Sequence, residues 1–142
     1  MKKIITVGIA IVFVLVVGGI GLHFYQQLTA SDLNINERII AKSIDESGKP
    51  KEIAGKVSDV KIDREWGQAY FSIPVNVKRQ DAYRMELIYD NQIIDEGMLS
   101  VSEAGYLNYE FSNLSKMKPG NYFIFLYNEK DELIVYASCD VK

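Results

Sequence analysis

Histidine and cysteine are nearly missing from this sequence, which has one of each among its 142 residues, His23 and Cys139. A zinc site needs several such ligands, and a nucleophilic serine or cysteine needs a base such as histidine to activate it. Because His23 lies within a long apolar run, the rest of the chain has no histidine for a catalytic triad. We therefore expect a non-catalytic protein that requires no metal and no cofactor.

A single cysteine also excludes a disulfide within one chain. Two interpretations of Cys139 stay open. It is a buried thiol, because free cysteine is among the most buried residue types, or it forms a disulfide between two chains.

Motifs for phosphate, nucleophile and calcium sites are absent as well. The sequence has no G-x-S-x-G, no G-x-G-x-x-G and no P-loop. The acidic clusters near Asp45, Asp90 and Glu129 do not match a calcium loop, and we interpret them as solvated hairpin turns. A carboxylate pair acting on a glycoside remains an alternative, because 19 acidic residues supply many candidates.

Basic residues are too few for a phosphate-binding surface. The chain has 16 Lys and Arg against 19 Asp and Glu, a formal net charge of −3. Lys2 and Lys3 are the only Lys, Arg, Asp or Glu residues before Asp32, so the remainder is more acidic still. Nucleic-acid binders carry a basic patch or stripe, and we predict no nucleic-acid partner.

The N-terminus, in contrast, holds a long apolar run. Ile4–Tyr25 contains no Asp, Glu, Lys or Arg and, as a helix, would span about 30 Å, the thickness of a bilayer core. Lys2 and Lys3 on its short side predict a cytoplasmic N-terminus and a C-terminal domain outside the membrane. We expect a single-pass membrane anchor over residues 1–25.

A cleaved signal peptide is the alternative to a retained anchor. The apolar run is longer than most signal-peptide cores, and Leu28 is not the small residue that a cleavage site ending at Ala30 requires. Either way the domain is exported, as a membrane-anchored or as a secreted protein.

Residues 26–36 are polar and are predicted to be a juxtamembrane linker, and residues 37–142 to form one extracytoplasmic domain. Apolar residues there alternate with polar ones, as in half-buried strands. Pro74 cannot donate to a β-ladder, so its strand is expected at a sheet edge or with a bulge. The expected strands, about seven, lie near residues 37–44, 69–77, 83–89, 93–99, 107–111, 122–127 and 133–139.

The stretch MKPGNY, Met117–Tyr122, resembles the turn before a late strand in immunoglobulin-like and fibronectin type III-like domains. Trp66 is similar to their core aromatic residues, and residues 120–137 resemble the closing hairpin of bacterial exported β-sandwich modules. The resemblance covers residues 37–142 in pattern, without the cysteine pair of antibody domains. It implies an immunoglobulin-like antiparallel β-sandwich, in a class of modules that mostly bind or scaffold.

The strand at 122–127 is apolar on both faces. If Tyr122, Ile124 and Leu126 point inward, the intervening aromatic residues point outward and could form a partner surface. Alternatively, another segment covers this second face, or a bulge mixes the two faces. Our candidate partner-binding residues are Tyr70, Tyr106, Phe123, Phe125, Tyr127 and Tyr136, and Ile134 is expected on the same outer faces.

Taken together, these patterns predict a non-catalytic, membrane-anchored binding or scaffold module of the cell envelope, with a protein partner there. The first alternative is a secreted inhibitor or ligand-binding protein, released by cleavage near Ala30. The second is an envelope hydrolase that uses two carboxylates.

Overall fold

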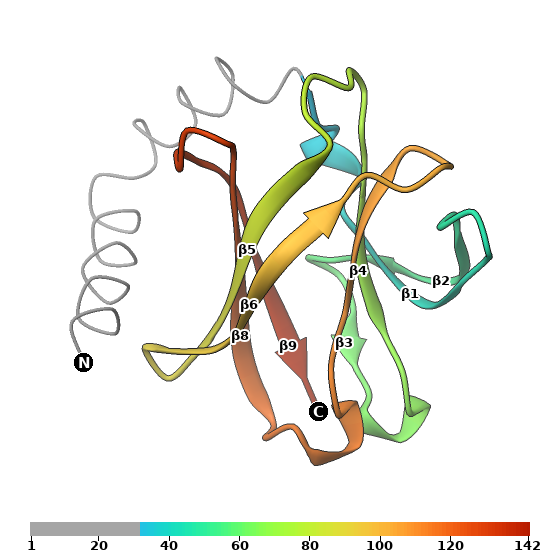
Figure 1. Ribbon diagram of the computed structural model, residues 1–142. Helices are drawn as coiled ribbons and strands as arrows, with labels where there is room; N and C mark the ends of the chain where they lie inside the picture. The colour runs from blue at the N-terminus through green and yellow to red at the C-terminus, as the bar shows by residue number, and fades with distance from the viewer. Residues whose placement is uncertain (1–31) are drawn as a thin grey trace.

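The structure, a computed structural model, describes residues 32–142, which form two β-sheets packed face to face (Figure 1). The sheets are antiparallel apart from one parallel pairing, between β3 and β9. The nine strands are β1 (Ile39–Ile44), β2 (Pro50–Lys56), β3 (Lys61–Ile62), β4 (Tyr70–Pro74), β5 (Ala82–Tyr89), β6 (Gln92–Ser100), β7 (Tyr106–Glu110), β8 (Gly120–Tyr127) and β9 (Leu133–Val141).

Helical structure in residues 32–142 is limited to three short 3₁₀ segments: η1 (Ile35–Glu37), η2 (Arg64–Trp66) and η3 (Leu114–Lys116). The predicted membrane segment, Ile4–Tyr25, lies outside the described residues. Within the described part, no helix is long and apolar enough to cross a bilayer.

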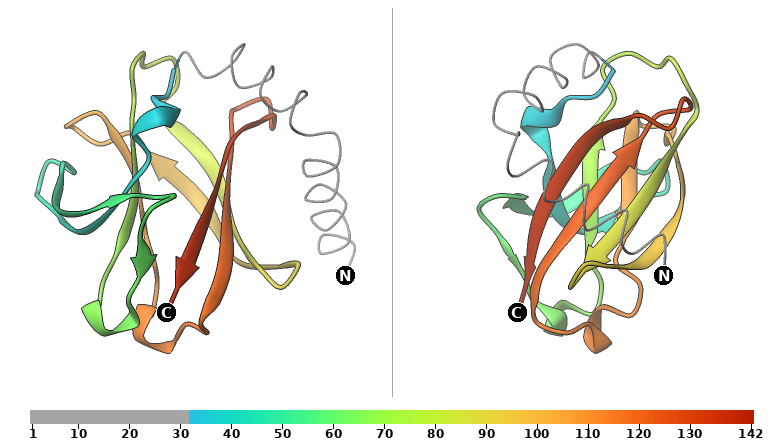
Figure 2. Two further views of the ribbon diagram at one scale, coloured as in Figure 1. Left: turned by 180° about the vertical axis from the view of Figure 1, so that it is seen from behind. Right: turned by 90° about the vertical axis from the view of Figure 1, so that its left-hand side faces the viewer.

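One sheet has four strands in the order β2-β1-β4-β7, and the other has five in the order β3-β9-β8-β5-β6. Figure 2 shows the two layers from behind and from the side, with β5, β8 and β9 adjacent. The predicted all-β sandwich is thus confirmed. The prediction from the sequence did not include β2, because its residues PKEIAGK do not alternate in polarity, or β3, because it is only two residues long.

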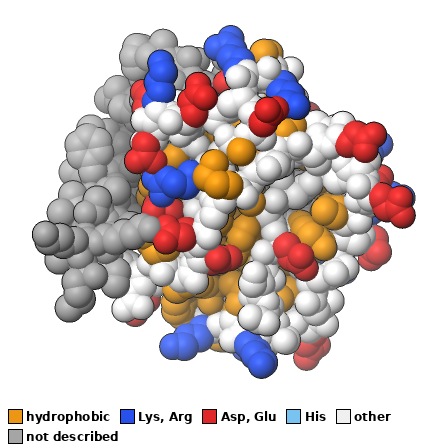
Figure 3. Space-filling view, in the orientation of Figure 1, with side chains coloured by type: hydrophobic (Ala, Val, Ile, Leu, Met, Phe, Trp, Pro, Cys, Tyr) orange, Lys and Arg blue, Asp and Glu red, His pale blue; other side chains and the backbone are white. Residues whose placement is uncertain are grey.

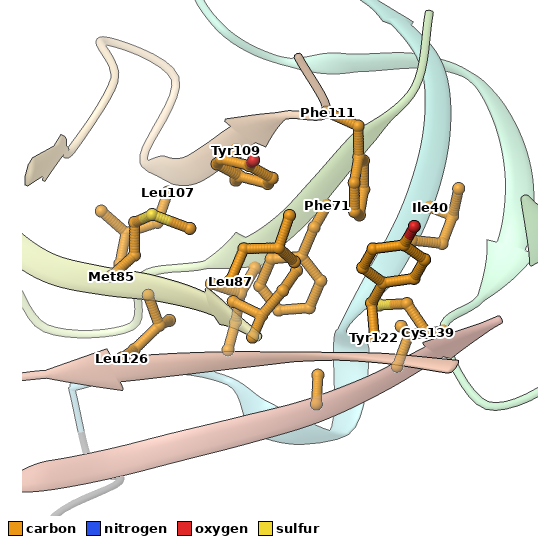
Figure 4. Packing of buried hydrophobic residues seen from close by; sticks show 14 of the residues in the cluster. Ile40, Phe71, Met85, Leu87, Leu107, Tyr109, Phe111, Tyr122, Leu126 and Cys139 are labelled. Atoms are coloured by element: carbon orange, nitrogen blue, oxygen red, sulfur yellow. The ribbon is translucent and has the colours of Figure 1, made fainter. Parts of the chain in front are cut away.

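The hydrophobic core lies between the sheets, as Figure 4 shows from close by. Every second residue of the alternating strands faces inward, because side chains in a strand point alternately to its two faces. Burying each large apolar side chain stabilises the fold by about 1.5–3 kcal/mol. Among the core residues are Phe71, Ile73, Met85, Leu87, Leu107, Phe111, Ile124 and Leu126, each at most 2% exposed.

Two predicted features of local structure are informative. The turn after β5 is confirmed, and Asp90 and Asn91 have φ of 52° and 60°, as a two-residue hairpin turn requires. The prediction that the strand of Pro74 lies at a sheet edge or carries a bulge was wrong. β4 lies between β1 and β7, and it pairs with β7 without a register shift. Pro74 is tolerated there because it ends β4, beyond Ser72, the last residue that pairs with β1.

The MKPGNY stretch forms a tight corner before β8. The Tyr122 hydroxyl donates to the Lys118 carbonyl at 2.6 Å. Gly120 has φ of 141°, and a Cβ there would lie 3.0 Å from the Tyr89 ring. Only glycine suits this position, because Tyr89 lies over it and stacks on Tyr122, with ring centroids 4.5 Å apart.

The chain enters the sandwich beside the loop that follows β4. The Asp32 carbonyl accepts hydrogen bonds from the backbone N–H groups of Asn76 and Val77. Leu33 is 2% exposed within the core. Residues 32 and 33 are therefore part of the sandwich. Val77, the last residue of the strand expected at 69–77, is 45% exposed because β4 has already ended at Pro74.

Candidate functional site

The apolar second face of β8 belongs to a small cluster on the outside of the five-stranded sheet, away from the other sheet. Tyr122, Ile124 and Leu126 face the main core, as predicted, and the residues between them face outward. We call this group the outer cluster. It consists of Ile88, Ile93, Phe123, Phe125, Tyr127, Leu133 and Tyr136.

Phe125 is the centre of the outer cluster. Its ring lies 6.4 Å from that of Tyr127 and 6.3 Å from that of Tyr136, measured between centroids. Phe125 lies on the outer face as predicted, but it is only 1% exposed and so is not part of a bare surface. Phe123, Tyr127 and Tyr136 are half-buried around it and present aromatic area at the rim.

A charged network borders this cluster. Glu86, 4% exposed, accepts a hydrogen bond from the Tyr127 hydroxyl at 2.9 Å and pairs with Arg84 at 2.8 Å. Arg84 also binds the Asp131 carboxylate at 2.7 Å and lies over the Tyr127 ring, 4.0 Å from its centroid. Burial, reinforced by the hydrogen bond to Glu86, raises the pKa of Tyr127. The network holds Tyr127 in one orientation, and nothing in the sequence pattern marked Glu86 as buried.

The six candidate residues do not form one surface. Phe123, Phe125, Tyr127 and Tyr136 lie together on the five-stranded sheet. Tyr70 and Tyr106 lie on β4 and β7 of the other sheet, near opposite ends of a pairing in which Tyr70 stands opposite Glu110 and Tyr106 opposite Pro74. Local alternation gives the face of a strand but not the sheet to which the strand belongs.

Ile134 was also placed incorrectly by alternation. The register of β8 and β9 shifts between Leu126 and Tyr127, where Leu126 pairs with Val135 and Tyr127 with Leu133. Ile134 therefore packs in the main core, and Leu133 joins the outer cluster instead. A bulge of this kind, one of the alternatives left open by the sequence, exchanges the faces locally.

The outside of the four-stranded sheet is polar and covered around Ser72 and Asn108. Ser72, fully buried, donates to the Asn108 side chain, whose amide donates to the Gly48 carbonyl at 2.8 Å. A Cβ on Gly48 would lie 2.4 Å from the Cβ of Ser102 and 3.2 Å from the Asn108 amide nitrogen, so the β1–β2 turn packs closely against β7 and the segment before it. This part of the face is therefore less suited to an apolar partner.

Two hollows lie elsewhere on the domain. One, of about 430 Å³, opens at the corner before β8 beside Tyr89, Ile94 and Met117, with Lys116 and Lys118 at its rim. The other, of about 380 Å³, lies beside β1 and β2, where the Lys42 ammonium is 4.7 Å from the Trp66 ring centroid. Neither brings together a set of catalytic groups, and within residues 32–142 no three His, Cys, Asp or Glu residues cluster as metal ligands.

Strand β6 is a further surface that the sequence reasoning missed. It ends the five-stranded sheet, and two of the four exposed large apolar side chains in residues 32–142 lie on it, Ile94 at 48% and Met98 at 62%. Figure 3, in which β6 lies toward the viewer, shows hydrophobic and acidic side chains interspersed on this side. The signal was present in QIIDEGMLS, which has apolar residues at both odd and even positions and acids as its only charged residues.

Comparison with known proteins adds no relative. No protein-family model matches the chain, and no curated protein matches it. The function must therefore be inferred from the surfaces described above.

Proposed function

We propose that this chain is a non-catalytic binding module, held on the outer side of a membrane by Ile4–Tyr25, that binds a protein of the cell envelope. The observation that carries the proposal is the outer cluster. An outward-facing sheet surface normally carries polar side chains, whereas this one carries seven apolar residues with an aromatic rim. Aromatic side chains are favoured where proteins bind one another.

The topology supports an immunoglobulin-like assignment of the sandwich. The sheet order β9-β8-β5-β6 matches the G-F-C-C′ order of immunoglobulin variable-type domains, and β1-β4-β7 matches A-B-E. Tyr122, near the start of β8, bonds back to the carbonyl four residues earlier, as the tyrosine corner of these domains does. Folds of this kind host many functions, so they support a binding role only together with the surface.

The charged groups near the outer cluster suit a structural role better than catalysis. Both carboxylate oxygens of Glu86 are engaged, one by Tyr127 and one by Arg84. A general acid or base needs an oxygen that can reach a substrate. We therefore assign Glu86 to positioning Tyr127 at the rim of the binding surface.

The test uses the full chain with a C-terminal tag, cross-linked in intact source cells. We expect a co-purified protein that is lost when Phe123→Ser and Tyr136→Ser are combined. The matched control combines Tyr70→Ser and Tyr106→Ser, two half-buried tyrosines on the opposite sheet, and should retain the protein. Circular dichroism must show that both variants fold.

Two outcomes would reject parts of the proposal. Equal retention of the partner by both double variants would exclude the outer cluster as the binding surface. A mature chain found in the medium and beginning at Ser31 would exclude the membrane anchor and favour the secreted alternative.

A further inference from the structure

The hollow at the corner before β8 lies between the two sheets, at one end of the sandwich. Tyr89, Asp90 and Ile94 line it from β5, β6 and their connecting turn, and residues 112–118 contribute from the segment that follows β7 of the other sheet. Its volume of about 430 Å³ falls within the range of small-ligand sites, about 300–1,000 Å³. Its described lining residues and the outer cluster have no member in common, so the two surfaces are separate.

The walls of this hollow are held in place by the fold itself. The Tyr89 ring stacks on Tyr122, and its hydroxyl donates to the Pro119 carbonyl at 3.2 Å. On the other side, the Met117 carbonyl accepts a hydrogen bond from the Arg64 guanidinium at 3.3 Å. A preformed site loses less free energy in ordering its own groups when a ligand binds.

One part of the lining is apolar. Tyr89 and Met117 are half-buried, and Ile94 is 48% exposed. Aromatic and thioether side chains pack well against a planar apolar group. A ring placed there would remove the exposed area of Ile94 from water, which favours binding.

The charged part of the lining is basic. Lys116 and Lys118 are exposed, and neither ammonium group has an ion pair within residues 32–142. Asp90 is the only acidic residue among the described residues that line the hollow, so two lysines and one aspartate leave a net charge of +1. Figure 3 shows basic side chains beside a hydrophobic area at the end of the domain where η3 lies. Lysine binds carboxylates as a point charge, and this balance favours a monoanion.

The second hollow, beside β1 and β2, lacks this balance. Among its described lining residues, one lysine, Lys42, stands against one glutamate, Glu52, so their charges cancel. The Lys42 ammonium is also engaged, because it lies 4.7 Å from the Trp66 ring centroid. This second hollow therefore serves as an internal control for the first.

We propose that the hollow before β8 binds a small organic acid that has one carboxylate and an apolar ring. The ring packs against Tyr89, Ile94 and Met117, and the carboxylate contacts Lys116 and Lys118. This site adds a small-molecule ligand to the proposed binding module and does not depend on the outer cluster.

The test follows backbone amide NMR shifts of the full chain in detergent micelles, with free probe concentrations measured by dialysis. The probes are phenylacetate, phenylacetamide, which lacks the charge, and acetate, which lacks the ring. We expect phenylacetate to shift the amides of residues 113–118. It should bind about fivefold more tightly than phenylacetamide, because each exposed lysine–carboxylate contact changes affinity by about two- to threefold. Acetate should give no saturating shift at the same concentrations.

Three variants make the result specific. Lys116→Gln combined with Lys118→Gln should remove the preference for phenylacetate over phenylacetamide. The matched control, Lys49→Gln combined with Lys51→Gln, changes two exposed lysines with the same spacing and should keep the preference. Asp90→Asn should strengthen phenylacetate binding about twofold, because it removes the opposing charge.

Several outcomes would overturn the inference. They are equal affinity for phenylacetate and phenylacetamide, equal shifts at the second hollow, and an unchanged preference when Lys116 and Lys118 are both replaced. Concentration-dependent shifts of residues 113–118 without a probe would identify a second copy of the chain as the occupant. Much tighter binding of a peptide that ends in phenylalanine would identify the C-terminus of a protein instead of a small acid.

The inference and the proposed function can fail separately. Phe123→Ser combined with Tyr136→Ser should abolish the cellular partner and leave phenylacetate binding unchanged. Loss of phenylacetate binding in this folded double variant would show that the hollow depends on the outer cluster and would overturn the independent site. Retention of the cellular partner when Lys116 and Lys118 are replaced would leave the proposed function in place.

Discussion

The two faces of β8 lie in different environments although both are apolar. Ile124 and Leu126 on the inner face are enclosed between two sheets and are fully buried. On the outer face, Phe125 packs against side chains of its own sheet, with the Arg84–Glu86 network at one end. The comparison teaches that an apolar residue in a strand indicates that its side chain is buried. It does not indicate whether that side chain lies between two sheets or among side chains on the outside of one sheet. Within residues 32–142, only the inner face is enclosed by a second layer.

The largest effect should come from truncating the inner face. We expect Ile124→Ala to lower the free energy of unfolding by about 3–4 kcal/mol, because it leaves a cavity that the two sheets cannot close. Phe125→Ala should cost less, about 2–3 kcal/mol, because the half-buried rim around it can close part of the space left, so that the transfer term dominates. Urea unfolding of the two variants measures both values. Equal losses would show that the outer cluster is as closed as the core.

Removing the buried carboxylate should have the next largest effect. Glu86→Ala leaves Arg84 and the Tyr127 hydroxyl without their buried partner and should cost about 2–3 kcal/mol. Glu103→Ala, at an exposed glutamate in the segment after β6, is the control and should change stability by less than about 0.5 kcal/mol. If the two variants unfolded at the same urea concentration, the network would have no stabilising role.

Alkaline pH tests both faces at once. Burial raises the pKa of Cys139, on the inner side of β9, from 9.0 to about 12 and also raises that of Tyr127 on the outer face. A raised folded-state pKa stabilises below the unfolded-state value, and this contribution is lost as the pH rises toward the folded-state value.

We therefore expect the domain to lose about 2 kcal/mol between pH 9 and pH 11 through Cys139 alone. The loss measured by urea unfolding should be smaller in Cys139→Ala over the same range. A pH dependence identical to that of the unmodified chain would contradict the assignment.

The smallest effect concerns two buried phenols of the main core. Tyr122→Phe removes the hydrogen bond to the Lys118 carbonyl and should cost about 1 kcal/mol. Among residues 32–142 the buried Tyr83 hydroxyl has no hydrogen-bond partner, so Tyr83→Phe should leave stability unchanged or raise it by up to about 1 kcal/mol. Thermal unfolding followed by circular dichroism distinguishes the two. A clear loss in Tyr83→Phe would reveal a partner for that hydroxyl.

Much of the sandwich follows from local patterns, because alternation over 83–89, 107–111 and 122–127 places one face of each strand in the core. The turn at Asp90-Asn91 follows from its residue types. Three features depend on which strands pair and could not be predicted from the sequence. They are the assignment of Tyr70 and Tyr106 to the other sheet, the burial of Glu86, and the exposed apolar side chains of β6. The exchange of Leu133 and Ile134 needed the register of β8 against β9, which no local pattern contains.

Cys139 gives the domain an internal reporter of its own unfolding. Its side chain is 1% exposed and its thiol is held protonated at neutral pH, so it is buried rather than available for a disulfide between folded chains. Thiol reagents react with the thiolate, and labelling must therefore proceed through molecules in which β9 has opened. The labelling rate of the single cysteine then measures how often the sheet opens in the full chain.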